Sequence, residues 1–299
     1  MSILLQGILL GSLYALASQG LSIVFGVLKL VNLAHGAILV AGAILTSMFL
    51  SQHGGNPFVV IVLVSLAIAV IAYFVQAYLL SPIMKRLSEA TIPATFAIAI
   101  AIQSLLLYGF GSDPRIINTF FSTSNIVIFG NSLRVSLLVS LALAIFITIA
   151  ISLTLNRTRF GAEVQAAAAD PVAAGLNGIN VRHTYGLVFA GAAAISAIAG
   201  SIIDITFAID PTSGLGWMVR SFTVVVLGGL GSIYGTLIGG ILLGVIEAFG
   251  ASIVGPQYRD LVVFGIFVLV LVIRPEGLAS LFANIKVPER FRKSVKNEK

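Results

Sequence analysis

The stretch VSLLVSLALAIFITIAISLTLN, residues 135–156, contains no charged side chain. A helix that spans the hydrocarbon core of a bilayer needs about 20 mostly apolar residues, within a range of about 17–25. Residues 139–153 are apolar on every side, whereas a strand of a transmembrane β-barrel would alternate apolar and polar residues over about 10 positions. The stretch therefore predicts a membrane-spanning helix.

Comparable uncharged stretches occur along the whole chain. Of its 299 residues, 58% are hydrophobic and only 9% are charged, compared with about 25% charged residues in an ordinary soluble domain. Lys29 is the only charged residue among residues 1–84. The other uncharged stretches are residues 90–112, 183–203, 221–246 and 261–273. A soluble fold could not bury so much apolar surface, so we expect an all-α integral membrane protein.

The uncharged stretches predict a polytopic helical bundle of about 8–9 spans. We expect a single transmembrane domain over residues 1–285 and a basic tail over residues 286–299. The N-terminal apolar run lacks the basic region of a signal peptide and is too long for one, so we expect it to remain as a helix. The expected spans are residues 3–28, 31–50, 58–81, 92–111, 134–155, 184–203, 218–230, 233–253 and 259–274.

Lysine and arginine residues in short loops predict the orientation, because they favour the cytoplasmic side. They mark three loops, at Lys85 and Arg86, at residues 157–182, and at Arg274 with the following tail. Residues 218–254 must then start and finish outside, as a hairpin of two short crossings or a re-entrant loop. Its turn is expected in the glycine cluster at residues 228–232. The same count places the N-terminus outside and the C-terminus in the cytoplasm.

Several function classes find no support in the residues. The chain has no cysteine, and its three histidines are widely scattered, so we expect no thiol chemistry and no metal site. No nucleophile–base–acid set suggests an enzyme. The net charge of +6 owes much to the tail, so it does not indicate a nucleic-acid partner. No phosphate-binding glycine loop is present either, so any ATP must be bound by a partner subunit, and we expect no cofactor on this chain.

Isolated polar residues within the apolar stretches are candidates for a solute pathway, because such groups usually face a bundle interior or a wet cavity. Lys29, Asn32 and His35 would share one face of a helix. The candidates for the pathway are Asn32, His35, Gln19 and Gln103. Alternatively, Asn32 and His35 only form hydrogen bonds between helices while Lys29 reaches the membrane surface. Residues 27–36 could also form a broken or re-entrant segment, which would change the predicted side of the N-terminus.

Three acidic residues, Glu247, Asp204 and Asp210, also lie in or near the apolar stretches. Glu247 lies well inside a predicted span, where it could relay protons or form a hydrogen bond to a neighbouring helix. Asp204 and Asp210 are expected in an outer loop, where water solvates them.

The cytoplasmic loop 157–182 contains signals for two short helices. Residues 162–169 have high helix propensity. Asp170 followed by Pro171 is a helix-start signal, and Gly178 is expected to end the second helix. This segment is either a docking element for a cytoplasmic partner or a structured linker. The candidate coupling residues are Phe160, Gly161, Ala169, Asp170, Pro171, Leu176 and Gly178.

Glycines recur at spacings of four near the C-terminal end. Such small-residue faces allow the backbones of membrane helices to approach closely. We therefore expect these residues to pack helices together, and a shorter stripe at Gly7 and Gly11 to do the same. The candidate packing residues are Gly231, Gly235, Gly239, Gly240 and Gly244.

Several short strings, in this order, resemble the permease subunits of branched-chain amino acid ABC importers. The resemblance extends from Gly7 to about Leu278. The strings are GSLYAL at residues 11–16, GLSIVFG at 20–26, NLAHG at 32–36, AD at 169–170, GINV at 178–181, GGLGS at 228–232 with Gly235, and RPEGL at 274–278.

This resemblance implies a partnership with a second permease, related or identical, two cytoplasmic ATP-binding subunits and a periplasmic solute-binding protein. It implies a bacterial inner-membrane permease with loop 157–182 as the coupling element. The capped short helices of that loop lead us to expect alternating access, driven by ATP binding to the partner subunits. The family usually has arginines where this chain has Ala162, Gln165 and Gly175, so docking by shape is expected rather than by basic contacts. The solute could also be urea, an amide, an aromatic acid or a sugar. A self-sufficient secondary transporter or channel, with an ion site at Glu247 or His35, and a structural or assembly protein are the alternatives of other classes.

Overall fold

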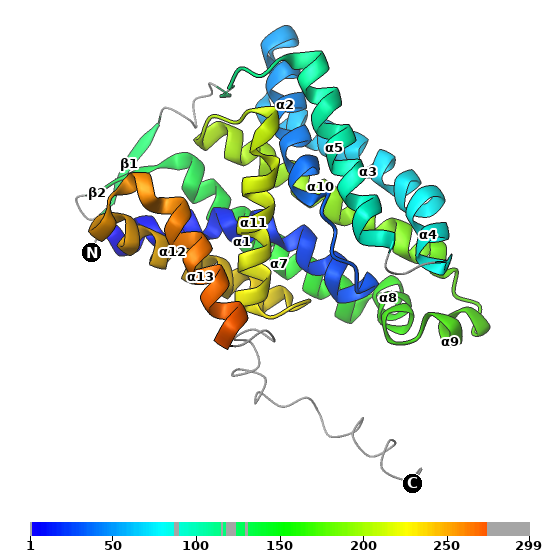
Figure 1. The fold of residues 1–299 in the computed structure, drawn as a ribbon. Coiled ribbons are helices and arrows are strands. Elements are labelled where there is room, and N and C mark those ends of the chain that lie inside the picture. Colours follow the sequence, from blue (N-terminus) through cyan, green and yellow to red (C-terminus); the bar gives the residue numbers. More distant parts are fainter. Residues whose placement is uncertain (1, 87–89, 115, 118–123, 129–130, 274–299) are drawn as a thin grey trace.

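The computed structural model describes residues 2–86, 90–114, 116–117, 124–128 and 131–273 (Figure 1). These residues form helices joined by short connections, with one pair of short strands. The elements in chain order are α1 (Ser2–Leu28), α2 (His35–His53), α3 (Pro57–Phe74), the π-helix η1 (Val75–Leu80), α4 (Ser81–Arg86), α5 (Thr91–Phe110), β1 (Asn125–Ile128), β2 (Asn131–Arg134), α7 (Val135–Arg157), α8 (Arg159–Ala169), α9 (Pro171–Leu176), α10 (Val181–Thr206), the 3₁₀-helix η3 (Pro211–Ser213), α11 (Gly214–Gly228), α12 (Ile233–Val254), the 3₁₀-helix η4 (Pro256–Tyr258) and α13 (Arg259–Ile273).

Seven helical segments of the described residues are long and apolar enough to cross a membrane. They comprise α1, α2, α3 with its continuation through η1 into α4, α5, α7, α10 and α12. Two shorter apolar helices, α11 and α13, have 15 described residues each. These elements occupy the stretches that the sequence marked as spans, so the predicted helical membrane bundle is confirmed.

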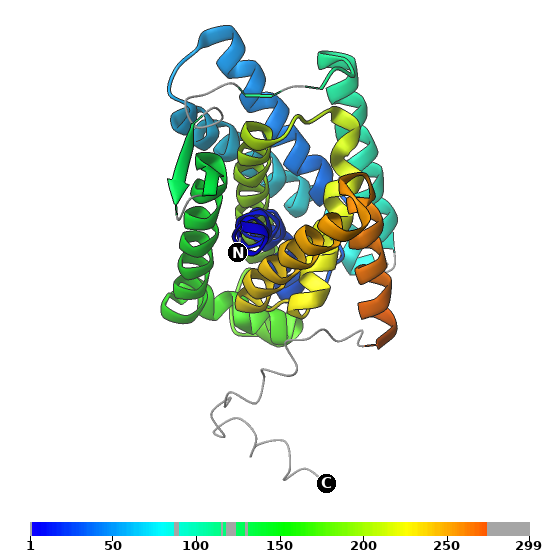
Figure 2. The ribbon, with the colours of Figure 1, turned by 90° about the vertical axis from the view of Figure 1, so that its left-hand side faces the viewer.

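Helix α1 lies at the centre of the bundle. Figure 2 shows it nearly end-on, with α7, α10 and α12 around it. Its side chains from Leu13 to Leu21 are almost completely buried. Helix α5, in contrast, leaves most of its apolar side chains exposed. Since water cannot solvate such a surface favourably, the outer helices present their apolar faces to lipid.

The predicted hairpin within residues 218–254 is present. Helix α11 ends at Gly228 and α12 begins at Ile233, and the turn between them contains Gly229 and Gly231 at φ values of +89° and +83°. Glycine occupies this left-handed region without the clash that a Cβ atom would cause. The Ser232 side chain then caps α12 by accepting a hydrogen bond from the Gly235 amide at 3.1 Å.

The connection between α1 and α2 differs from the main prediction. Helix α1 ends at Leu28, Lys29 has a φ of +54°, and α2 begins only at His35. The Asn32 side chain accepts a hydrogen bond from the Ala34 amide at 3.1 Å, within a turn. Lys29, Asn32 and His35 therefore do not share one helix face, and the alternative of a broken segment is correct.

Two other details also differ from the sequence expectations. The polar connection after α5 contains an antiparallel strand pair, in which Asn125 lies opposite Arg134. Asp204 lies in α10 and is 1% exposed, so the expectation that it lies in an outer loop was wrong. The basic tail, Arg274 and Leu278 lie outside the described residues.

The α8–α9 segment, residues 159–176, lies at one end of the bundle, and β1, β2 and the N-terminus lie at the other (Figure 1). Successive long helices alternate in direction between these two ends. That the α8–α9 segment faces the cytoplasm stays a prediction from the basic loops.

A glycine seam, formed by Gly7, Gly11, Gly240 and Gly244, joins α1 to α12. A Cβ atom added to Gly11 would lie 2.5 Å from the Ile241 Cα atom, and an added Cβ on Gly244 would meet the backbone of Gly11. On the other side of α12, an added Cβ on Gly239 would lie 2.7 Å from the Val224 carbonyl oxygen, and one on Gly235 would meet Gly228. The backbones thus approach more closely than any larger residue permits.

Replacing Gly244 by alanine tests the seam. We expect Gly244→Ala to lower stability by roughly 1–3 kcal/mol, because backbone atoms block the added methyl group. The matched control is Gly191→Ala, since nothing lies within 4 Å of that position and alanine there gains about 1 kcal/mol in helix propensity. Thermal unfolding of the purified chain in detergent measures both. Equal melting temperatures for the two variants would contradict the close packing.

Candidate functional site

His35 links three helices in the interior. Its Nε2 atom lies 2.8 Å from the Ala17 carbonyl oxygen, and its Nδ1 atom lies 3.1 Å from the Ser196 hydroxyl oxygen. Because a carbonyl oxygen can only accept, Nε2 carries the hydrogen, and the single hydrogen of the Ser196 hydroxyl is shared between His35 Nδ1 and the Ala192 carbonyl oxygen, 2.8 Å away. The ring is 2% exposed. His35 therefore joins the start of α2 to α1 and α10, as the alternative interpretation of hydrogen bonding between helices expected.

The other three pathway candidates lie in different surroundings. Gln19 is fully buried in α1 and donates a hydrogen bond from Nε2 to the Thr148 hydroxyl oxygen of α7 at 2.8 Å. Asn32 is 3% exposed in the turn before α2. Gln103 is half-buried on α5, at the edge of the bundle. The structure therefore buries Gln19, Asn32 and His35 inside the bundle, each with its own partners, and leaves Gln103 partly exposed on α5.

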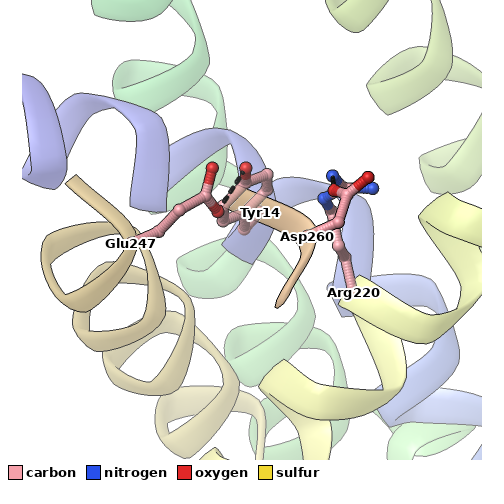
Figure 3. Close-up of polar contacts among 4 residues, drawn as sticks. All are labelled: Tyr14, Arg220, Glu247 and Asp260. Atoms are coloured by element: carbon pink, nitrogen blue, oxygen red, sulfur yellow. Dashed lines mark hydrogen bonds and ion pairs between the residues drawn. The ribbon is translucent and has the colours of Figure 1, made fainter. Parts of the chain in front are cut away.

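A cluster of charged and aromatic residues connects four helices (Figure 3). The Tyr14 hydroxyl of α1 donates a hydrogen bond to Glu247 Oε2 of α12 at 2.7 Å, and Glu247 is 2% exposed. Arg220 of α11 forms an ion pair with Asp260 of α13. The hydrogen bond between helices that was considered for Glu247 is thus present. Sequence reasoning missed Arg220, although a lone arginine inside an apolar stretch was an available signal.

Charged side chains in a membrane protein are stable when an opposite charge or a donor lies nearby. Arg220 lies between an acidic partner on α13 and the ring of Trp217, whose centroid is 5.5 Å from the guanidinium carbon. Trp217 also contacts the Tyr14 ring edge-on, with centroids 6.0 Å apart. The cluster therefore ties the α11–α12 hairpin to α1 and α13 by polar contacts.

Asp210 lies in the loop before α11, as the sequence predicted. Its carboxylate accepts hydrogen bonds from the Thr212 amide at 2.7 Å and the Ser213 hydroxyl at 2.7 Å, and so caps η3. Burial raises the pKa of the Asp210 carboxyl group, but the hydrogen bonds from Thr212 and Ser213 lower it more, so the pKa lies below its ordinary value. Asp210 thus has a local structural role in this loop.

The α8–α9 segment has the helix signals that the sequence predicted. Asp170 Oδ1 accepts hydrogen bonds from the amides of Val172 at 2.8 Å and Ala173 at 3.0 Å, with Pro171 at the first position of α9. Gly178 follows the helix with a φ of +85°. The predicted start and end of the second short helix are therefore confirmed.

Helix α8 is attached firmly to the bundle. Gly161 is buried against the carbonyl groups of Thr154 and Leu155, and Gln165 donates a hydrogen bond to the Leu155 carbonyl oxygen at 2.6 Å. The Tyr185 hydroxyl of α10 donates to the Ala167 carbonyl oxygen at 2.9 Å. These contacts attach α8 to both α7 and α10.

Helix α9, in contrast, presents apolar side chains to the surroundings. Val172 is 72% exposed and Leu176 is 86% exposed, and Pro171 is also exposed, while Phe160 at the start of α8 is half-buried and Ala169 at its end is exposed. Apolar side chains exposed together at the end of a bundle mark an interaction surface. The segment thus combines an exposed apolar face on α9 with hydrogen bonds that attach α8 to the spans.

These features define a class of protein, the multi-pass helical membrane proteins. The chain belongs to the family of permease components of branched-chain amino acid transport systems, because residues 3–271 match that family. This result agrees with the resemblance inferred from the short sequence strings.

Individual proteins support the same assignment. The high-affinity branched-chain amino acid transport system permease protein BraD of Pseudomonas aeruginosa is 32% identical over 290 residues, which cover 92% of this chain and 94% of BraD. The corresponding permease protein LivH of Escherichia coli K12 is 27% identical over 286 residues, which cover 91% of this chain and 93% of LivH. Among solved structures, a chain of PsaBC from Streptococcus pneumoniae in complex with Fab has a TM-score of 0.53 and 12% identity, covering 94% of this chain and 96% of that one. At that identity the likeness concerns the fold alone.

The Tyr14–Glu247 contact gives a stability prediction. Tyr14→Phe removes the hydroxyl donor and leaves the buried carboxylate without it, which should cost roughly 1–3 kcal/mol. Thermal unfolding in detergent measures the loss. The control is Tyr258→Phe, because Tyr258 is 47% exposed in η4 and should tolerate the change. If Tyr14→Phe melts at the wild-type temperature, the contact does not stabilise the bundle.

Proposed function

We propose that this chain is the membrane-spanning permease subunit of an ATP-driven importer that carries branched-chain amino acids across a bacterial inner membrane. The α8–α9 segment is the observation on which the proposal rests: it exposes an apolar face at one end of the bundle and is joined rigidly to α7 and α10. A partner subunit bound to this apolar face could therefore move α7 and α10 through their contacts with α8. BraD and LivH, by their names, belong to high-affinity branched-chain amino acid systems.

In this proposal, residues 1–285 form a single transmembrane domain, and residues 157–182 are the coupling loop. Two cytoplasmic ATP-binding subunits contact α9, and ATP binding in those subunits displaces the segment. Because α8 is bonded to α7 and α10, the displacement tilts these spans, and the open side of the solute path alternates. The permease pairs with a second permease, related or identical, and a periplasmic protein delivers the solute. The C-terminal tail lies in the cytoplasm.

The solute path in this proposal lies between the two permeases. Gln19, Asn32 and His35 are buried in the interior of this subunit, where they hold helices in position near the path. Gln103, half-buried on α5, is better placed to meet a solute or the second permease. The glycines of α12 provide close contacts along which helices slide during the cycle.

Uptake by the assembled transporter tests the proposal for the solute. Reconstituted into vesicles with its ATP-binding subunits and solute-binding protein, the transporter should accumulate leucine, isoleucine or valine only when ATP is present. Competition with urea, amides, aromatic acids and sugars measures selectivity. If the transporter accumulates one of these solutes instead of the branched-chain amino acids, the proposed solute is wrong. Ion-driven uptake by this chain alone would refute the ATP-driven mechanism.

Substitution of Leu176 tests whether the ATP-binding subunits dock on the apolar face of α9. Leu176→Asp places a charge on the exposed apolar face of α9 and should cost about 2 kcal/mol of docking free energy, more than tenfold in affinity for the ATP-binding subunits. The matched control is Leu176→Met, which keeps the face apolar. Co-purification and ATP-dependent uptake measure both effects, and the amount of inserted protein should be unchanged. Normal coupling of Leu176→Asp would show that α9 is only a linker.

A further inference from the structure

A cavity of about 470 Å³ at the end near the N-terminus is lined in part by Arg134 and Arg259, but a larger cavity lies beside the α8–α9 segment. Its volume is about 730 Å³, and it lies between the end of α1, helix α4, helix α9 and the start of α10. Much of its wall is apolar, including Leu28, Met84 and Ile179. The cavity is therefore at the ends of membrane spans, where a bilayer meets water.

Two basic side chains line this cavity, Lys29 and Arg182, and the described lining residues include no acidic one. Arg182 is held in position by two contacts. Its Nε atom donates a hydrogen bond to the Ala77 carbonyl oxygen at 2.6 Å, and its guanidinium lies 4.4 Å from the centroid of the Tyr78 ring. Both partners belong to the π-helix η1, an irregularity that often accompanies functional sites. The positive charge at this cavity is thus fixed by the fold.

Lys29 has an unusual backbone conformation. Among the described residues it is the only non-glycine with a positive φ, +54°. It follows the last residue of α1, at a position where glycine is the common choice because a side chain there is strained. Strained positions of this kind are concentrated at functional sites. The exposed ammonium group at the cavity supplies a physical reason for a lysine at a position that favours glycine.

We propose that this cavity binds an anionic glycerophospholipid of the cytoplasmic leaflet. The phosphate lies between Lys29 and Arg182, and an acyl chain covers the apolar wall. Basic pockets at the cytoplasmic ends of membrane helices bind anionic headgroups in this way. Only the assignment to the cytoplasmic leaflet rests on the proposed function. Because Pro171 and Leu176 of α9 also line the cavity, the lipid supports the coupling surface from the side of the membrane.

Lipid retention by the assembled transporter tests this proposal. Native mass spectrometry in detergent should show retained phosphatidylglycerol in preference to phosphatidylcholine. Lys29→Gly removes the charge while relieving the backbone, so it should weaken phosphatidylglycerol retention by about fivefold without loss of folding. Lys29→Arg should retain the lipid. The control is Arg157→Gln, because Arg157 is exposed at the same end but does not line the cavity.

Equal retention of both lipids, or normal phosphatidylglycerol retention by Lys29→Gly, would overturn the proposal. So would a loss of retention in Arg157→Gln as large as that in Lys29→Gly. Displacement of the lipid when the ATP-binding subunits assemble would also overturn it. Glycerol 3-phosphate distinguishes a lipid from a soluble anion. If it binds as tightly as phosphatidylglycerol, the cavity recognises a free phosphate ester instead. Retention is measured without transport, so a failure here is distinct from a failure of the proposed import function.

Discussion

Hydrocarbon provides neither hydrogen bonds nor a hydrophobic force between helices, and this constraint governs the structure. Every backbone polar group at membrane depth must be satisfied within the protein, which leaves helices as the elements of this bundle. Helices in lipid then associate through close packing and side-chain hydrogen bonds. The glycine seam provides the close packing, since Gly11 and Gly244 bring the backbones of α1 and α12 into contact. The Tyr14–Glu247 and His35–Ser196 contacts provide side-chain hydrogen bonds between helices.

The same constraint explains how much the sequence alone could predict. Uncharged stretches of spanning length located the long helices, because in lipid each must be apolar over its whole length. Helix caps are local, so Asp170 and Pro171 identified the start of α9 correctly. Glycine clusters indicated the turn between α11 and α12 for the same reason. The glycine spacings indicated packing faces, although only the structure identified α1 and α11 as the helices that meet α12.

Features that depend on distant partners were not predictable. Nothing in the local pattern indicates that Lys29 adopts a positive φ, since glycine is the usual signal for that conformation. The burial of Asp204 in α10 depends on neighbouring helices, so its position near the end of an apolar stretch was misleading. The same limit applies to the candidate site. The sequence identified Gln19 and His35 as isolated polar residues, but their partners, Thr148 and Ser196, lie more than a hundred residues away.

A bilayer around this bundle separates the α8–α9 segment, on one side, from the β1–β2 strand pair on the other. Because the chain has no cysteine, single cysteines can be introduced at two exposed positions, Leu176 in α9 and Val127 in β1. A maleimide that cannot cross membranes should label Val127→Cys in intact cells. It should label Leu176→Cys only after the membrane is opened. Labelling of both positions in intact cells, or of neither until the membrane is opened, would contradict the account.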